Sequence, residues 1–288
     1  MCSALEKSLT NQSGIWVVAA CFNEEAVIAK FLERLIALNQ ISQIVLVDDG
    51  SSDGTTTKIK QFQNTLIKKG SYVKVVLIEL TRNFGKEAAM LAGLDHAKGN
   101  CEAVVLIDSD LQHPPELILP MIKAWNKGAE IVTAVRNDRD EESRLKITTA
   151  SWFYKVFNQI VDSIQLQEGA GDYRLLSSPV VEALTKMREF SRFSKGLVPW
   201  TGYKSVQIDY KRPQRIAGKS SWNLLKLLSY AFDGIFSFSA VPLKIWTLLG
   251  LTVSAISLIY GSWIIIRTFL YGVDVAGYPS LIVAVLFL

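Results

Sequence analysis

One uncharged apolar run constrains this chain more than any other feature of its sequence. It comprises the 22 residues from Ile245 to Ile266, which lie between Lys244 and Arg267. At about 1.5 Å per residue, a helix of this length measures roughly 33 Å, and the hydrocarbon core of a bilayer is about 30 Å thick. Helices buried in soluble proteins rarely stay uncharged over such a length, so the run predicts a membrane-spanning helix.

A second apolar run, Ser280 to Leu288, has nine residues. At about 1.5 Å per residue it measures roughly 14 Å, under half of a bilayer core. The link between the two runs is short and contains Gly272, Asp274, Gly277 and Pro279. These features predict a transmembrane hairpin over residues 241–288, in which the second arm is either incomplete or a re-entrant stub.

Positive charge gathers before the membrane run. Between Tyr203 and Lys244 the basic residues are Lys204, Lys211, Arg212, Arg215, Lys219, Lys226 and Lys244, against Asp209 and Asp233. Loops rich in Lys and Arg stay on the cytoplasmic side of a membrane. We therefore expect a multi-pass protein of the bacterial inner (plasma) membrane with most of the chain in the cytoplasm.

Composition excludes several classes of protein. Three cysteines, Cys2, Cys21 and Cys101, are too few for a disulfide framework and lack metal-ligand spacing, which fits a reducing compartment. The net charge of +4 is modest, and no basic stripe with interleaved aromatics indicates a nucleic-acid partner. Residues 1–14 are polar without a signal-peptide pattern, so we expect a flexible N-terminus.

Apolar runs alternate with amphipathic stretches over the first half of the chain. The runs predicted as buried strands are Ile15–Phe22, Gln43–Val47, Val73–Leu80, Ala103–Ile107 and Glu130–Val135. The stretches predicted as helices are Glu24–Asn39, Asp53–Lys69, Lys86–Lys98 and Pro115–Lys127. Continuously apolar strands that alternate with helices indicate a mostly parallel sheet covered on both faces. The fold class is therefore α/β, in which ligands bind outside the carboxyl ends of the strands.

Acidic and amide side chains follow three of these strands. The first strand leads into Phe22-Asn23-Glu24-Glu25, the second into the segment Asp48–Gly54, and the fourth into Asp108-Ser109-Asp110. One such strand end would be ordinary helix capping. Three of them at one edge of a sheet favour a binding site.

Asp108 and Asp110 are the strongest candidates for a metal site. Residues two apart in an extended segment point to the same side, so both carboxylates can face one point, and Gln112 could add a carbonyl oxygen. Oxygen ligands suit Mg²⁺ or Mn²⁺, and a cation offsets the repulsion between two carboxylates. In the alternative interpretation, Asp110 or His113 merely caps a helix that begins at the following prolines.

The segment Asp48–Gly54 also has two interpretations. Part of it predicts a turn and an N-cap, at Ser51 or Asp53, that leads into the second helix. One carboxylate beyond that requirement could instead accept a hydrogen bond from a nucleotide base or a ribose hydroxyl.

Four motifs in this order carry a resemblance to a known family. They are FNEE after the first strand, VDDGSSDGT after the second, RNFGKEAAMLAGLDHAKG at Arg82–Gly99, and DSDLQHPPE. Together with GDYRL (Gly171–Leu175) and the membrane hairpin, they resemble the inverting GT-A glycosyltransferases of family 2. The chain is most similar to the polyisoprenyl-phosphate glycosyltransferases, relatives of dolichol-phosphate mannose synthase, and within these to the bacterial undecaprenyl-phosphate branch.

The resemblance implies an organisation and a reaction. It places a cytoplasmic GT-A catalytic domain at residues 15–221, an interfacial helix at 222–239, and the transmembrane hairpin after it. The implied reaction is inverting transfer of a hexose, glucose from UDP-glucose, to undecaprenyl phosphate in cell-envelope glycosylation, with Mg²⁺ or Mn²⁺ as cofactor. GDP-mannose or another UDP-sugar is the alternative donor. The membrane-bound relatives also suggest a homo-oligomer.

The resemblance also implies roles for individual positions. Ala20, Phe22, Glu24, Val47, Asp49 and Ser109 match nucleotide-binding residues, although many relatives have proline in place of Ala20. Asp108, Asp110, Arg136 and Arg215 match catalytic residues, and Asp108, Asp110 and Gln112 match metal ligands. Lys86, Arg215 and Lys219 are expected at the acceptor phosphate. Relatives often follow the second arginine with Gly-x-Ser-Lys, whereas this chain reads Gly218-Lys219-Ser220-Ser221.

The implied chemistry needs no general base. A lipid phosphate is already anionic near pH 7, because its second pKa is about 6, and it can attack the anomeric carbon directly. The protein must supply charge compensation, from a metal at the leaving diphosphate and from Lys86, Arg136, Arg215 and Lys219 at the phosphates. In the alternative, these four are solvated surface charges or attract anionic lipid headgroups.

Two segments between the sheet and the membrane have helical amphipathicity. Trp222–Ser239 places large apolar side chains along one face and polar ones on the other, which predicts an interfacial helix. Arg144–Ile164 is a second candidate, or a helix packed on the sheet or on another subunit.

Three rival classes of protein fit the sequence less well. A nicotinamide-dependent oxidoreductase fails, because the G-x-G at Gly169–Gly171 comes late and has Arg174 in place of a third glycine. A processive polysaccharide synthase would carry a Gln-x-x-Arg-Trp motif, which is absent. A membrane-anchored nucleotide-sugar sensor without activity would be favoured by loss of the acidic pair, and that pair is intact.

Overall fold

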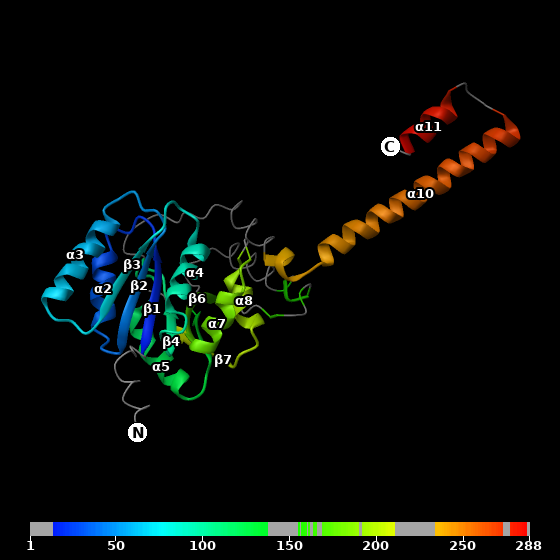
Figure 1. The fold of residues 1–288 in the computed structure, drawn as a ribbon. Helices are drawn as coiled ribbons and strands as arrows, with labels where there is room; N and C mark the ends of the chain where they lie inside the picture. Colours follow the sequence, from blue (N-terminus) through cyan, green and yellow to red (C-terminus); the bar gives the residue numbers. More distant parts are fainter. Residues whose placement is uncertain are drawn as a thin grey trace, which may run out of the picture. The chain divides into compact units, whose positions relative to one another are not determined.

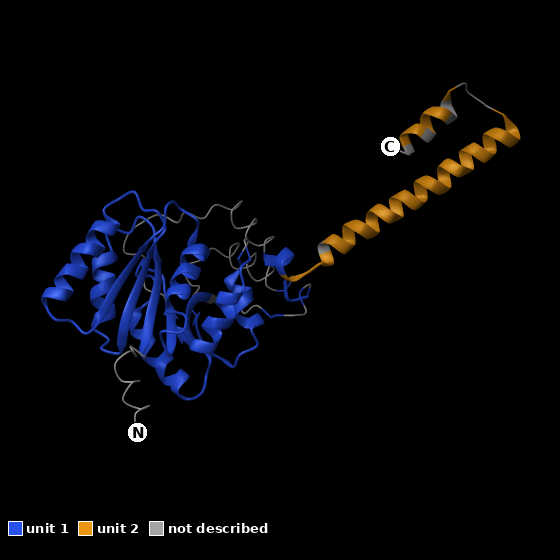
Figure 2. Cartoon of the chain, in the orientation of Figure 1, with its two compact units in different colours: residues 1–237 blue, residues 238–288 orange. Residues whose placement is uncertain are grey.

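The chain forms two compact units, residues 1–237 and residues 238–288 (Figure 2). The computed structural model describes residues 14–137, 155, 157–159, 161, 164–165, 169–189, 192–210, 234–272 and 277–286. Each unit is described by itself below.

A seven-stranded sheet forms the centre of the first unit, with the strand order β3-β2-β1-β4-β6-β5-β7 (Figure 1). The strands are β1 (Ile15–Cys21), β2 (Ile41–Asp48), β3 (Lys74–Glu79), β4 (Ala103–Leu106), β5 (Ile131–Arg136), β6 (Ala170–Ser177) and β7 (Ser205–Tyr210). β1, β2, β3 and β4 pair in parallel, as do β5 and β7. β6 runs antiparallel to both of its neighbours, β4 and β5. The parallel half therefore presents the ends of β1, β2 and β4 at one edge.

Helices cover both faces of this sheet. They are α2 (Ile28–Ile36), α3 (Thr55–Lys68), α4 (Lys86–Ala97), the 3₁₀ turn η1 (Pro115–Leu117), α5 (Ile118–Asn126), α7 (Ser178–Lys186) and α8 (Ser194–Trp200). Apolar side chains of α2, α3 and α5 pack into one buried cluster with β1, β2 and β4. α4 contacts β1 and β2 on the other face and also packs against α7.

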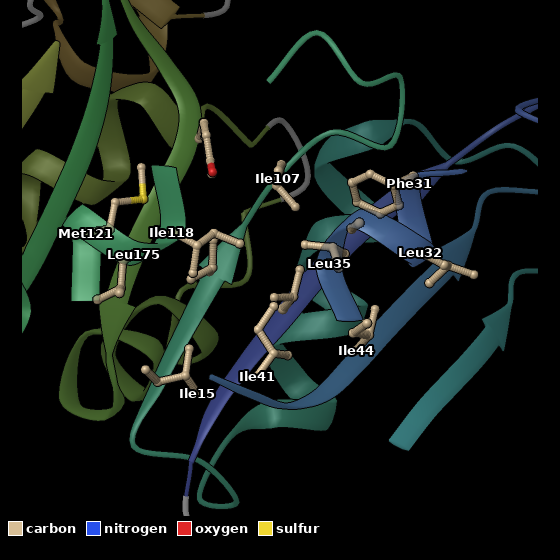
Figure 3. Close-up of a cluster of buried hydrophobic side chains, with 14 of the residues drawn as sticks. Ile15, Phe31, Leu32, Leu35, Ile41, Ile44, Ile107, Ile118, Met121 and Leu175 are labelled. Carbon is tan, nitrogen blue, oxygen red and sulfur yellow. The ribbon is translucent and has the colours of Figure 1, made fainter. Parts of the chain in front are cut away.

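Side chains along β1 point alternately to the two faces of the sheet, so this one strand packs against helices on both faces. Val17 and Ala19 belong to the cluster with α2, and both are fully buried. Figure 3 shows that cluster, with Phe31, Leu32 and Leu35 of α2 against the sheet. Burial of each such side chain contributes about 1.5–3 kcal/mol, so this layer fixes the position of the loops that leave the sheet.

The opposite face of the sheet requires a glycine on α4. A Cβ added at Gly93 would lie 2.3 Å from Cγ1 of Val18 and 3.2 Å from Cγ2 of Val47. Glycine therefore allows the helix backbone to approach β1 and β2 closely. This close approach fixes the start of α4, where Lys86 lies, relative to the strand ends.

The elements predicted from the sequence are confirmed for this half of the chain. All five predicted strands and four predicted helices are present, and the ends differ by a few residues. The mostly parallel sheet flanked by helices is also confirmed. The GDYRL motif forms part of β6, whose antiparallel insertion the alternating pattern did not reveal. Most of Arg144–Ile164 and residues 222–233 lie outside the described residues.

The second unit contains α10 (Val241–Tyr271) and α11 (Tyr278–Leu286). Leu243–Tyr271 is long and apolar enough to cross a membrane. Its side chains are mostly exposed, for example that of Trp246 at 69%. α11 has nine residues. Among the described residues, α10 is the one helix that is long and apolar enough to cross a membrane. The helix predicted as a membrane span is therefore present, while the multi-pass arrangement is not supported.

Candidate active site

The candidate site is built from the segments that follow β1, β2 and β4 at the carboxyl edge of the sheet. Parallel pairing brings these three strand ends together, since Cys21 pairs with Asp48 and Val18 pairs with Leu106. The fourth contributor is the loop before α4, which follows β3. Polar groups from four separate parts of the sequence therefore converge here.

Hydrogen bonds join the segment after β1 to the segment after β2. Asn23 adopts a left-handed conformation (φ 56°), its N–H donates to Ser51 Oγ at 2.9 Å, and its Oδ1 accepts from the Ser52 N–H at 2.9 Å. The Glu24 N–H donates to Thr55 Oγ1 at 2.9 Å. The FNEE and DDGSSDG motifs thus form one rigid loop pair.

Two of the acidic groups after β2 serve this loop structure. Asp48 Oδ2 accepts the Ser51 N–H at 3.0 Å, and the Ser51 hydroxyl donates to Asp48 Oδ1. Asp53 Oδ1 accepts the N–H of Thr55 at 3.0 Å, at the start of α3. For these two carboxylates the turn-and-cap interpretation is supported by the contacts.

Asp49 is held differently, and it organises the loop before α4. Its two carboxylate oxygens accept the N–H of Phe84 at 2.7 Å and the N–H of Gly85 at 2.9 Å, and the side chain is 3% exposed. Gly50 has φ 74°, and a Cβ added there would lie 2.7 Å from the backbone of Arg82. The RNFG loop is thereby clamped onto the end of β2.

This clamped loop presents an aromatic and cationic surface. Phe84 is 49% exposed, and the Arg82 guanidinium carbon lies 4.5 Å from the centre of its ring. Phe22, which follows β1, is 44% exposed. Exposed aromatic rings at a strand edge can stack on a planar base.

The other predicted nucleotide-binding residues are less exposed than Phe22. Ser109 is buried and donates its hydroxyl to the carbonyl oxygen of Ala20 at 3.0 Å, which ties the end of β4 to β1. Val47 is fully buried against α4. Glu24 is partly exposed in the loop after β1. Their roles toward a nucleotide remain predictions.

Asp108 lies at the centre of a charged cluster. Its Oδ1 lies 2.6 Å from Lys86 Nζ, and the same ammonium lies 2.8 Å from Asp172 Oδ2. On the other side, Asp108 Oδ2 lies 3.5 Å from Nε2 of His113. Lys86 thus bridges a carboxylate after β4 and a carboxylate in β6.

A buried aromatic group fixes His113. Nδ1 of this imidazole lies 2.7 Å from the hydroxyl of Tyr210, and the ring packs 5.2 Å from that of Tyr173, centre to centre. The Tyr173 hydroxyl donates to the Pro114 carbonyl oxygen at 2.9 Å. His113 therefore holds Asp108 in place from the protein interior, which is the role of a residue that orients a ligand.

The cluster favours the charged forms of Asp108 and Lys86 and the neutral form of Glu87. Burial would raise the pKa of Asp108, but the Lys86 ammonium and His113 outweigh it and hold that pKa well below its ordinary value. The charges of Asp172 and Asp108 raise the pKa of Lys86 and outweigh the partial loss of water around its ammonium. Burial and the charge of Asp172 raise the pKa of Glu87. Asp108 and Lys86 therefore remain charged at neutral pH.

Asp110 and Gln112 form the turn after Asp108. Asp110 Oδ1 accepts the backbone N–H of Gln112 at 3.0 Å across Leu111, which has φ 59°. The Gln112 side chain is buried, and its Nε2 has no hydrogen-bond partner among the described residues. A buried amide of this kind can turn its oxygen toward a cation.

The residues therefore fit a divalent cation with oxygen ligands. Asp108 and Asp110 supply carboxylates and Gln112 a buried amide, a set suited to Mg²⁺ or Mn²⁺ with open positions for other ligands. No cluster of three or more His, Cys, Asp or Glu with metal-site geometry occurs in the described ranges. The metal-binding role of Asp108, Asp110 and Gln112 remains a prediction.

The predicted basic residues are placed only in part. Arg136 ends β5, and its N–H donates to the carbonyl oxygen of Gly169 at 3.2 Å, next to the start of β6. Lys86 is in the cluster around Asp108. Arg215 and Lys219 lie outside the described residues, so their roles remain predictions.

Three residues of the site were not assigned such roles from the sequence. Asp172 belongs to the GDYRL motif, which marked the segment but not its contact with Lys86. His113 was considered only as a helix cap. Glu87 accepts hydrogen bonds from the N–H and hydroxyl of Ser194, and so joins α4 to α8. The contacts of Asp172 and Glu87 leave no spacing signal because they join residues 86 and 107 positions apart, whereas His113 lies in the same motif as Asp108 and depends on the turn between them.

Comparison with known proteins relates this chain to a known protein family. The family model of glycosyl transferase family 2 matches residues 16–185. A prophage bactoprenol glucosyl transferase homolog of Escherichia coli K12 is 44% identical over 278 residues, which is 95% of this chain and 88% of that protein. A bactoprenol glucosyl transferase of Shigella phage SfV is also 44% identical, with the same shares covered.

A solved structure also has the same fold. The mannosyltransferase PcManGT of Pyrobaculum calidifontis, solved in complex with GDP-Man and Mn²⁺, matches with a TM-score of 0.50 and 20% identity. The match covers 69% of this chain and 56% of that one. It confirms the GT-A fold expected from the sequence.

Proposed function

Since the chain belongs to glycosyl transferase family 2, and so is a glycosyltransferase, we propose that it transfers glucose from UDP-glucose to a polyisoprenyl phosphate, undecaprenyl phosphate. The observation that carries this proposal is the 44% identity to bactoprenol glucosyl transferases over 95% of the chain. That similarity extends beyond the GT-A domain into the part of the chain that contains α10. We place the enzyme in the bacterial inner membrane, with its catalytic domain in the cytoplasm.

The reaction we propose is a direct displacement with inversion. An oxygen of the lipid phosphate forms a bond to the anomeric carbon while the bond from that carbon to the diphosphate oxygen breaks, and UDP leaves. The nucleophile is already anionic near neutral pH, because the second pKa of a phosphate monoester is about 6. The described site is compatible with this chemistry, since Lys86 brings a positive charge beside Asp108.

Charge compensation is the main task of the side chains. Asp108, Asp110 and Gln112 would hold a divalent cation, which neutralises negative charge on the diphosphate when bound. Lys86 lies beside Asp108 and can attract a phosphate oxygen. Arg136, at the end of β5, is a second basic residue that could attract a phosphate. Arg215 and Lys219 would complete the acceptor-phosphate site.

The nucleotide would lie on the segments after β1 and β2. Phe22 and Phe84 expose aromatic rings that can pack on a base. Asp49 holds the loop that carries Phe84, so its effect on nucleotide binding is at least indirect. Glu24 is partly exposed and can accept a hydrogen bond from the ribose. In this arrangement the diphosphate would point toward Asp108.

A transfer assay tests this function. Labelled UDP-glucose would be incubated with full-length protein and undecaprenyl phosphate in detergent micelles, with Mg²⁺ or Mn²⁺ and then with chelator. We expect label in the organic phase, lost on chelation and in Asp110→Asn. The matched control is Asp95→Asn, which changes an exposed carboxylate paired with Arg188 at 2.7 Å. Transfer from GDP-mannose or another UDP-sugar would change only the donor, whereas nucleotide binding without transfer from any donor would favour a sensor.

A further inference from the structure

Both oxygens of Asp108 are already faced by cationic or hydrogen-bonding groups. Lys86 Nζ lies 2.6 Å from Oδ1, and His113 Nε2 lies 3.5 Å from Oδ2. A divalent cation binds a carboxylate oxygen at about 2.0–2.2 Å, closer than either of these groups. A cation that binds Asp108 therefore competes with these two groups for the same two oxygens.

The structure distinguishes the two partners by their freedom to move. His113 is buried, its Nδ1 lies 2.7 Å from the Tyr210 hydroxyl, and its ring packs against Tyr173. The Lys86 side chain is 41% exposed and ends a flexible four-carbon chain. Lys86 is therefore the partner that can leave Asp108.

Lys86 also has a second carboxylate that can retain it. Asp172 Oδ2 lies 2.8 Å from the ammonium, on a strand different from the one that leads to Asp108. The ammonium can give up one carboxylate and keep the other, so its charge does not become unpaired. The cost of displacement is lower for this reason than for a lysine with a single partner.

From these contacts we propose that Lys86 is an internal counter-ion that occupies the cation position of Asp108 until a divalent metal arrives, and that Asp172 is the positioning residue that receives it. The inference rests on the proposed function in one respect, namely that Asp108 binds a metal. It adds a regulatory consequence. In the metal-free site the negative charge of Asp108 is offset by the protein itself, and metal binding releases Lys86 next to the position expected for the phosphates.

Metal binding without donor or acceptor tests the proposal. Free Mn²⁺ would be measured by electron paramagnetic resonance during titration of full-length protein in detergent micelles. Lys86→Met removes the competing ammonium, and we expect its Mn²⁺ affinity to rise about tenfold. The control is Lys60→Met, which removes an equal charge from an exposed pair with Glu79 at 2.9 Å and should leave the affinity within about twofold.

A second variant separates displacement from simple repulsion. Lys86→Arg keeps the charge, but its planar fork can hold a carboxylate at two points, so we expect Mn²⁺ affinity severalfold below that of the wild type. If Lys86→Met tightens binding while Lys86→Arg matches the wild type, only repulsion operates and the displacement is refuted. Unchanged or weaker binding in Lys86→Met also overturns the proposal.

A stability measurement guards against misfolding. Lys86→Met leaves Asp108 and Asp172 without their shared cation, so Mn²⁺ should raise its melting temperature more than that of the wild type. An equal or smaller rise in the folded variant would contradict the proposal. These measurements use no sugar donor and no lipid acceptor. If the transfer assay fails but Lys86→Met still binds Mn²⁺ more tightly than the wild type, only the proposed function is rejected.

Discussion

Replacement of Asp49 by asparagine should loosen the loop before α4. The carboxylate accepts the N–H groups of Phe84 and Gly85 at 2.7 and 2.9 Å, and the side chain is 3% exposed. An asparagine has one acceptor oxygen, so its amide N–H₂ must face the second backbone N–H. The variant therefore keeps one neutral hydrogen bond and leaves one buried donor without a partner.

The size of the effect follows from these two bonds. Hydrogen bonds to a charged group contribute about 1.5–3 kcal/mol each, and an unsatisfied buried donor costs about 1–3 kcal/mol. Local opening of the loop limits the loss, so we expect the free energy of unfolding to fall by about 2 kcal/mol. For a domain of 150–250 residues this corresponds to a melting temperature lower by about 4–8 °C.

Thermal unfolding of the full-length protein in detergent micelles, followed by near-ultraviolet circular dichroism, would measure this change. The control is Glu79→Gln, which alters an exposed carboxylate at the end of the neighbouring strand, and it should change stability by less than about 0.5 kcal/mol. UDP binding by Asp49→Asn should weaken as well, because the loop carries Phe84. Weaker UDP binding with a melting temperature within about 1 °C of the wild type would refute the clamp and favour direct contact with the base.

Three further predictions concern the core and the charged cluster. Gly93→Ala should lower stability by about 1–3 kcal/mol, measured by thermal unfolding, because its Cβ would lie 2.3 Å from a valine methyl of β1. Asp172 has its pKa lowered to about 2 although burial opposes this, since Lys86 outweighs it; its stability contribution is complete above about pH 4 and lost as pH falls toward 2. In acid unfolding of Lys86→Met that loss should become smaller, while Lys195 still lowers the pKa of Asp172, and an unchanged profile would contradict the assignment. His113→Phe should keep the ring packing but weaken Mn²⁺ binding severalfold, because Asp108 loses the group that orients it, and titration with Mn²⁺ would show equal affinity if the role were only structural.

The fold was largely predictable because its signals are local. Continuous apolar strands such as Ile15–Cys21 and amphipathic helices such as Ile28–Ile36 show their periodicity within a few residues. Parallel pairing then follows from the alternation of strands and helices. β6 was not predicted as an antiparallel insertion, since its neighbours in the sheet, β4 and β5, precede it in the chain and a crossover leaves no local mark.

The site was predictable to the extent that it follows strand ends. Asp108 and Asp110 were predicted as a pair from their spacing in an extended segment, whereas Ser109 and Asp110 lie in a turn, so the pairing stays a prediction; the family to which the motif points is confirmed. Asp49 was assigned to the base from the resemblance, and the structure adds its clamp on the Phe84–Gly85 backbone. Contacts between distant segments, such as Lys86 with Asp172, depend on tertiary packing that no motif encodes.

The membrane part illustrates the same limit. The uncharged length of Ile245–Ile266 predicts one span, and α10 contains it. The hairpin prediction relied on a second run that forms α11, which has nine residues. The length of an uncharged run can be read directly from the sequence. Whether a second, shorter run also crosses the membrane cannot be read in this way.

The anomeric configuration of the lipid product tests the central claim most directly. After incubation of the full-length protein with UDP-glucose, undecaprenyl phosphate and Mg²⁺, the extracted lipid would be purified and examined by proton and phosphorus nuclear magnetic resonance. Direct attack by the lipid phosphate on an α-linked donor predicts a single β-glucosyl phosphodiester of the lipid. An α-linked product, or free glucose with unmodified lipid phosphate, would contradict the account.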